Sequence, residues 1–69
     1  MPTRQRQVTV RVTYDVDGVR AEAVLADERA FLVGTGWVAH HRLSPFPVPE
    51  DRAVAGALRD VARQLAAPS

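Results

Sequence analysis

Two adjacent histidines, His40 and His41, and two serines, Ser44 and Ser69, are the side chains of this sequence best suited to chemistry. A serine becomes a nucleophile only beside a base, and neither serine has the sequence context of a nucleophile elbow. Neighbouring residues in a strand point to opposite faces, and no cysteine or further histidine is present to complete a zinc site. We therefore expect no catalytic residues, no bound metal and no enzymatic activity.

The segment Gly34-Thr35-Gly36-Trp37-Val38-Ala39 formally matches the glycine-rich fingerprint of dinucleotide-binding proteins. That fingerprint requires a strand before the glycines and a helix directly after them, so that the helix N-terminus can hold a pyrophosphate. Here the glycines lie inside an expected strand, and a proline-rich segment follows. We interpret them as glycines that allow close packing, and we expect no cofactor.

Length and composition limit the organisation of the chain. Its 69 residues contain no cysteine, carry a net charge of +1 and have arginine as their only basic side chain besides histidine. A chain of this size supports one small core, without disulfides to stabilise it. We expect a soluble, cytoplasmic protein without a membrane segment, in which residues 1–7 form a basic tail, residues 8–66 one domain, and residues 67–69 a C-terminal tail.

Residues 8–16 alternate between apolar and polar side chains, which predicts a half-buried strand. Asp17-Gly18 follows, and this dipeptide between two β-rich runs is typical of a type I′ hairpin turn, in which both central residues have φ > 0. The expected register places Val16 opposite Val19, Tyr14 opposite Ala21, Val12 opposite Ala23 and Val10 opposite Leu25. On the other face Asp15 would pair with Arg20, and Arg11 would lie diagonal to Glu22.

A second turn is expected at residues 27–29, followed by a third strand over residues 30–41. The strand has two possible phases. One directs Phe31, Val33, Trp37 and Ala39 toward the core; the other directs Leu32, Gly34, Gly36 and Val38 toward it. We favour the second phase, because glycines within a strand often mark the close approach of another element.

Residues 43–49 alternate proline with other residues, which predicts an extended connection with Phe46 as its anchor. A helix is expected from Pro49, with acidic residues in its first turn and Pro68 as terminator. Its apolar positions at helical spacing are Val54, Leu58, Val61 and Leu65. The predicted fold is therefore α+β, an antiparallel three-stranded meander followed by one amphipathic helix.

Three segments carry a resemblance to a known family: residues 20–23 (RAEA), residues 33–39 (VGTGWVA) and residues 53–65 (AVAGALRDVARQL). Together they resemble a family of small actinobacterial proteins of unknown function, described as having a fold like that of double-stranded-RNA-binding domains. The similarity covers most of residues 8–66. It implies a β-β-β-α arrangement, and it does not by itself imply RNA binding. We expect no leading helix of the kind such domains have, because the residues before the first strand leave no room for one.

Two kinds of partner follow from these expectations. One helix covers one face of the sheet, and the favoured phase leaves an apolar open face that usually has a partner. We expect self-association as a homodimer, or another protein partner, on that face, through Val24, Phe31, Val33 and Trp37. The alternative is weak binding of nucleic acid, with phosphate contacts from Arg4, Arg6, Arg11, Arg52, Arg59 and Arg63. We disfavour this alternative, because the helix begins with Glu50-Asp51, which repels phosphate.

Overall fold

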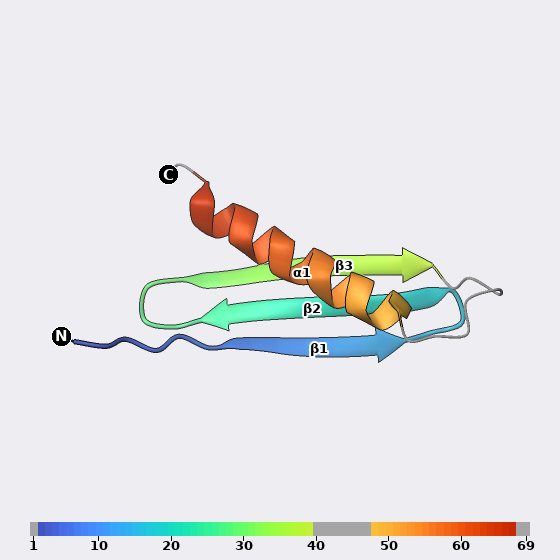
Figure 1. The fold of residues 1–69 in the computed structure, drawn as a ribbon, viewed down its shortest axis with the longest axis horizontal. Coiled ribbons are helices and arrows are strands. Elements are labelled where there is room, and N and C mark those ends of the chain that lie inside the picture. Colours follow the sequence, from blue (N-terminus) through green and yellow to red (C-terminus); the bar gives the residue numbers. More distant parts are fainter. Residues whose placement is uncertain (1, 40–47, 68–69) are drawn as a thin grey trace.

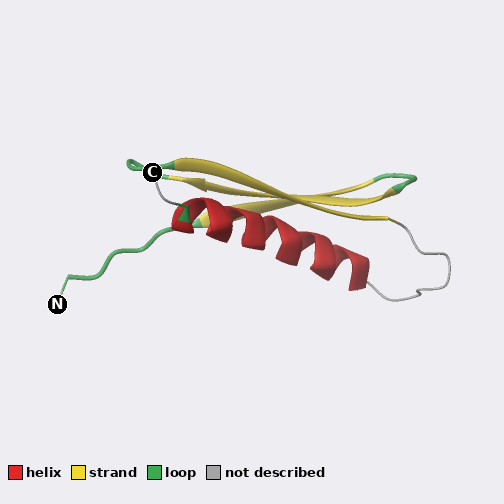
Figure 2. Ribbon diagram, turned by 90° about the horizontal axis from the view of Figure 1, so that it is seen from above, coloured by secondary structure: helices red, strands yellow, loops and turns green. Residues whose placement is uncertain are grey.

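The structure of the protein is a computed structural model that describes residues 2–39 and 48–67. It contains strands β1 (Val8–Tyr14), β2 (Gly18–Ala26) and β3 (Phe31–Ala39), followed by helix α1 (Val48–Ala66). The strands form one antiparallel sheet in the order β1-β2-β3, and α1 crosses one face of it diagonally (Figures 1 and 2). The predicted α+β meander with one helix is confirmed. The expectations for His40, His41, Ser44, Phe46, Pro68 and Ser69 concern residues outside the described ranges.

Both hairpin turns are held by an aspartate that binds its own backbone. The Asp15 carboxylate accepts hydrogen bonds from the amides of Asp17 and Gly18, at 2.8 and 3.0 Å. The Asp27 carboxylate accepts them from Arg29 and Ala30, at the same two distances. The prediction of a type I′ turn at Asp17-Gly18 is wrong, because no described glycine has a positive φ. An aspartate side chain fills the role that left-handed backbone would have played.

The longer first turn shifts the predicted register by two residues. Tyr14 lies opposite Val19 instead of Ala21, and β1 ends there, so that Val16 is part of the turn and not of the strand. Because the shift is an even number, each side chain stays on its expected face. Its cross-strand partners change: Thr13, not Asp15, lies opposite Arg20, and Arg11 lies directly opposite Glu22 instead of diagonal to it.

The favoured phase of β3 is correct, with its glycines beneath the helix. A Cβ atom added at Gly36 would overlap the carbonyl oxygen of Ala53, and one at Gly34 would overlap that of Ala57. Side chains at these positions would therefore force α1 away from the sheet. Phe31 and Trp37, of opposite phase, lie on the other face and remain 72% and 47% exposed.

The helix residues that contact the sheet are smaller than predicted. Ala53, Ala57 and Val61 are buried, whereas Leu58 and Leu65 remain 42% and 49% exposed. The expectation that both leucines belong to the core face is wrong. The glycines of β3 let the helix backbone come so close that Ala53 and Ala57 lie at the line of contact, with the predicted core residue Val61 one turn further on, and the leucines lie to one side of it.

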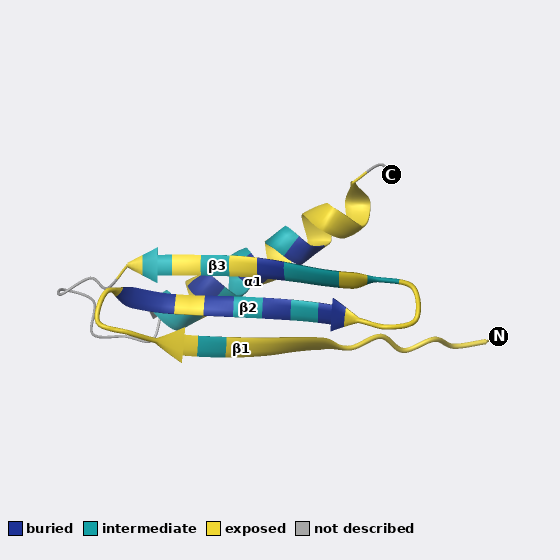
Figure 3. Cartoon of the chain, turned by 180° about the vertical axis from the view of Figure 1, so that it is seen from behind, coloured by how far each residue is buried: buried dark blue, intermediate teal, exposed yellow. Residues whose placement is uncertain are grey.

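Strand β1 is the least buried of the three strands, although its apolar side chains alternate as expected. Val8 and Val10 are 41% and 38% exposed, and Tyr14 is 60% exposed. The prediction of a half-buried strand overestimated this burial, because α1 packs over β2 and β3 and leaves most of β1 uncovered (Figures 1 and 3). The core lies mainly between β2, β3 and the helix.

Candidate interaction surfaces

The open face of the sheet, on the side away from α1 (Figure 3), carries all four predicted interface residues, as the register of β2 and β3 shows. Val24 lies directly opposite Val33, and both are half-buried. Phe31 lies opposite Ala26 at one end of β3, and Trp37 lies opposite Arg20 toward the other end. These side chains follow β3, so the apolar part of the open face is a strip along that strand.

Trp37 has contacts on two sides of its ring. The Arg20 guanidinium carbon lies 5.7 Å from the ring centroid, a cation–π distance. A Cβ atom added at Gly18 would lie 2.9 Å from Trp37 Cη2 and from Cζ2. It would overlap the Val38 carbonyl oxygen more severely still, so Gly18 is needed because the β3 backbone and the indole both lie close to it, and not for a left-handed turn. These contacts fix the ring in place while leaving about half of it exposed.

Polar residues separate the two ends of the apolar strip and occupy the β1 side of the open face. Glu22 lies between Arg11 on β1 and Thr35 on β3. Thr9 and Thr13 lie on the same face of β1, opposite Val24 and Arg20 respectively. The open face is thus polar along β1 and mostly apolar along β3, where Thr35, opposite Glu22, interrupts the apolar strip between Val33 and Trp37.

The six arginines of the alternative interpretation do not form one surface. Arg4 and Arg6 lie in the tail and Arg11 lies on the open face, whereas Arg52, Arg59 and Arg63 lie on the exposed side of α1, across the sheet. Arg63 forms an ion pair with Asp60 at 2.7 Å. A single duplex could contact only part of this set.

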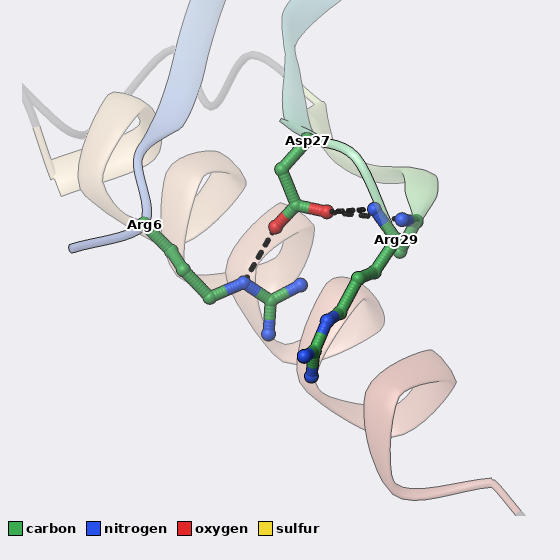
Figure 4. Close-up of polar contacts among 4 residues, drawn as sticks. Arg6, Asp27 and Arg29 are labelled. Carbon is green, nitrogen blue, oxygen red and sulfur yellow. Dashed lines mark hydrogen bonds and ion pairs between the residues drawn. The ribbon is translucent and has the colours of Figure 1, made fainter. Parts of the chain in front are cut away.

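A polar cluster at the β2–β3 turn was not expected from the sequence (Figure 4). The Arg6 Nε atom donates a hydrogen bond to the Asp27 carboxylate at 2.6 Å, which ties the N-terminal tail to the turn. The backbone amide of Arg29 and the Arg6 guanidinium lower the pKa of Asp27 below its ordinary value of 3.8. A shallow hollow beside the carboxylate is lined by Arg4, Arg6 and Arg29 together with Gln5 and Glu28. The only signal in the sequence was an acid following β2 and two arginines in the tail.

The outer edge of β3 is occupied by side chains of the helix, which the sequence analysis missed. Asp60 accepts a hydrogen bond from the Thr35 amide at 3.0 Å, and Gln64 donates one to the Val33 carbonyl at 2.8 Å. Asp60 and Gln64 are four residues apart, so they lie on one side of the helix. This spacing of two polar residues beside the buried face is the signal that could have indicated the contact.

No cluster of three potential metal ligands occurs within residues 2–39 and 48–67, and α1 is not apolar enough to cross a membrane. Comparison with protein families and with curated proteins found no match to this chain. The resemblance to the actinobacterial family therefore remains a prediction.

Proposed function

We propose that the protein is a small, non-catalytic interaction module that self-associates through the open face of its sheet. The observation that carries the proposal is the exposure of two aromatic side chains on one strand, Phe31 at 72% and Trp37 at 47%. Val24 and Val33 lie between them and are half-buried. Large exposed apolar patches on small proteins usually mark an interface.

The division of the open face favours a partner with the same division. A second copy presents an apolar strip of the same length, whose ends are about 20 Å apart at roughly 3.3 Å per residue of strand. Stacked with their strips in contact, two copies would bury two aromatic side chains each, at about 150 to 250 Å² per side chain. The polar side chains that β1 directs to this face, Thr9, Arg11 and Thr13, would remain in solvent at the rim.

The small core gives this association a thermodynamic benefit. A chain of 69 residues without cysteine has few other sources of stability, and association stabilises the folded state by mass action. We therefore expect the melting temperature of the wild type to rise with protein concentration.

The Trp37→Asp variant tests the proposal. A carboxylate at this position would be solvated in the free protein but unpaired in the contact, so it should abolish the face-to-face pair. In sedimentation equilibrium at two concentrations, we expect a folded variant with half the mass of the wild type. Arg59→Asp, which makes a larger change of charge on the exposed side of α1, is the matched control and should keep the wild-type mass.

Two outcomes would overturn the proposal. One is a wild type that sediments as a monomer at every concentration. The other is a Trp37→Asp variant whose mass equals that of the wild type.

The nucleic-acid alternative is tested separately, by titrating the protein with duplex RNA. Modules that bind double-stranded RNA contact two minor grooves and the phosphates between them from one continuous surface. The distribution of the six arginines over opposite sides of the sheet does not provide such a surface. Submicromolar binding with a steep salt dependence, weakened by Arg59→Ala and Arg63→Ala, would favour the nucleic-acid alternative.

A further inference from the structure

The two edges of the sheet differ in how their backbone groups are satisfied. At the β3 edge, Asp60 and Gln64 bind the amide of Thr35 and the carbonyl of Val33. Within residues 2–39 and 48–67, neither a strand nor a side chain forms a hydrogen bond with the outer edge of β1. An exposed strand edge of this kind is a template for strand addition.

The same edge has apolar side chains on the helix face of the sheet. Val8 and Val10 are 41% and 38% exposed on β1, and Leu58 is 42% exposed on the neighbouring helix. The helix covers β2 and β3 and leaves the helix-side face of β1 largely uncovered (Figure 1). A strand paired with β1 would place further side chains beside Val8 and Val10 on that face and reduce their exposure.

The two ends of β1 differ in charge. The tail continues in line with the start of the strand and carries Arg4 and Arg6 (Figure 1), of which Arg6 is already paired with Asp27 of its own chain. At the other end the Tyr14 hydroxyl is beside Glu50, with Asp51 close enough to raise its pKa as well. An identical strand laid antiparallel would bring the basic tail of each copy to the acidic end of the other. This self-complementarity identifies the partner strand as another copy of β1.

We propose that β1 pairs antiparallel with β1 of a second copy around a two-fold axis, which gives a continuous six-stranded sheet with both helices on one face. Residues of the same face must then lie opposite each other. A two-fold axis at Arg11 would oppose two like charges. An axis at Val10 instead places Thr9 opposite the partner's Arg11, Val8 opposite the partner's Val12, and Arg6 opposite the partner's Tyr14.

This edge pairing uses none of the four residues of the apolar strip, Val24, Phe31, Val33 and Trp37, and goes beyond the association proposed above. Both open faces of the six-stranded sheet would point the same way, so two such dimers could stack through Trp37 into a tetramer. The two interfaces can therefore be separated experimentally. In the Trp37→Asp background, association through the open face is removed and association through β1 should remain, as a dimer.

Disulfide cross-linking tests the edge pairing, because the natural chain has no cysteine to interfere. Directly opposed residues of an antiparallel pair have Cα atoms within the range that a disulfide can span. In the Trp37→Asp background, we expect Val10→Cys to form a covalent dimer under mild oxidation. Thr35→Cys, at the edge bound by α1, is the control. Cross-linking of Val10→Cys that is no faster than that of Thr35→Cys would overturn the proposal.

The register is tested with a mixed pair. Val8→Cys and Val12→Cys should cross-link to each other when mixed, faster than either variant cross-links to itself. Self-linking of Val12→Cys that is faster than linking in the mixture would contradict the axis at Val10.

A charged variant provides a test that needs no covalent bond. Val10→Lys in the Trp37→Asp background places a cation next to its own copy at the axis, and it should reduce the mass from dimer to monomer. The control is Val16→Lys, at a turn residue that is 92% exposed, and it should leave the dimer intact. A Trp37→Asp protein that is already monomeric would refute the edge pairing while leaving the open-face proposal intact.

Discussion

The Asp60 carboxylate on helix α1 accepts a hydrogen bond at 3.0 Å from the backbone amide of Thr35 on β3. This contact joins the helix to a strand edge, and the neighbouring Gln64 makes a second one to the Val33 carbonyl. The helix therefore has two roles in the fold. It covers one face of the sheet, and it prevents a further strand from pairing at one of its edges.

The first prediction concerns acid stability. The Thr35 amide, and after it Arg63, lower the pKa of Asp60 below its ordinary value of 3.8. A lowered pKa in the folded state stabilises the protein above the ordinary value, and this contribution is lost as the pH falls through the folded pKa. We expect Asp60→Asn to reduce the steepness with which the melting temperature falls below about pH 4.

The control for this variant is Asp51→Asn, which removes an equal charge from the first turn of the same helix without touching β3. Melting temperatures measured by circular dichroism from pH 2 to pH 7 give the comparison. An Asp60→Asn profile parallel to that of the wild type would contradict the role of this carboxylate.

The second prediction concerns the contact between α1 and β3. Gly36→Ala should lower the free energy of unfolding by about 1 to 3 kcal/mol, because the new Cβ atom overlaps the Ala53 carbonyl and forces the helix outward. Gly56→Ala is the matched control on the helix, where the added Cβ atom would lie 3.4 Å from the Cα atom of Gly36. It should be tolerated or should stabilise the helix by up to about 1 kcal/mol. The free energies of unfolding of both variants are measured by urea denaturation. An equal change in the two variants would contradict the close contact at Gly36.

The third prediction separates two explanations for Gly18. If the residue served a left-handed turn, asparagine would replace it well. Because a Cβ atom at Gly18 meets both the Val38 carbonyl and the Trp37 ring, Gly18→Asn should push β3 and the indole away and lower stability. The chain has one tryptophan, so a red shift of its fluorescence would report the displacement, with Asp17→Asn in the same turn as control. Wild-type fluorescence and stability in Gly18→Asn would rule out the packing role.

The fourth prediction concerns Tyr14, the only tyrosine of the chain. A hydrogen bond to the Glu50 carboxylate raises the pKa of Tyr14 above its ordinary value of 10.0. A raised pKa means that the protonated hydroxyl stabilises the fold below pH 10, and that this contribution is lost as the pH rises through the folded pKa. An absorbance titration should show ionisation above pH 10 in the wild type, and at lower pH in Glu50→Gln. Identical titrations of the two proteins would place Glu50 away from the hydroxyl.

The order of elements and the phase of β3 could be predicted because each depends on a local pattern. Alternation of apolar residues indicates strands. The two glycines of β3 indicate a face that another element approaches closely, whatever the exact position of that element. The register could not be predicted, since the rule for Asp17-Gly18 assumes a turn of two residues. The repeated pattern of an aspartate three residues before a small residue, at Asp15 and Asp27, was the better guide to both turns.

The helix face was missed for a different reason. Counting large apolar side chains favours Leu58 and Leu65, but the depth at which a helix sits depends on the surface beneath it. Where that surface is glycine, the nearest helix residues must be small, and Ala53 and Ala57 are buried instead. The bonds from Asp60 and Gln64 follow from this depth, because only a helix so close to the sheet can reach the backbone of β3.

The contact between glycines and alanines also affects the entropy of folding. Leucine and other branched side chains lose rotamer freedom when they become buried, whereas glycine and alanine have none to lose. Docking α1 onto Gly34 and Gly36 through Ala53 and Ala57 therefore fixes no side-chain torsion at these four positions, and Val61 is the branched side chain of the contact. Glycine loses more backbone entropy on folding than any other residue, so the two glycines of β3 offset part of this gain.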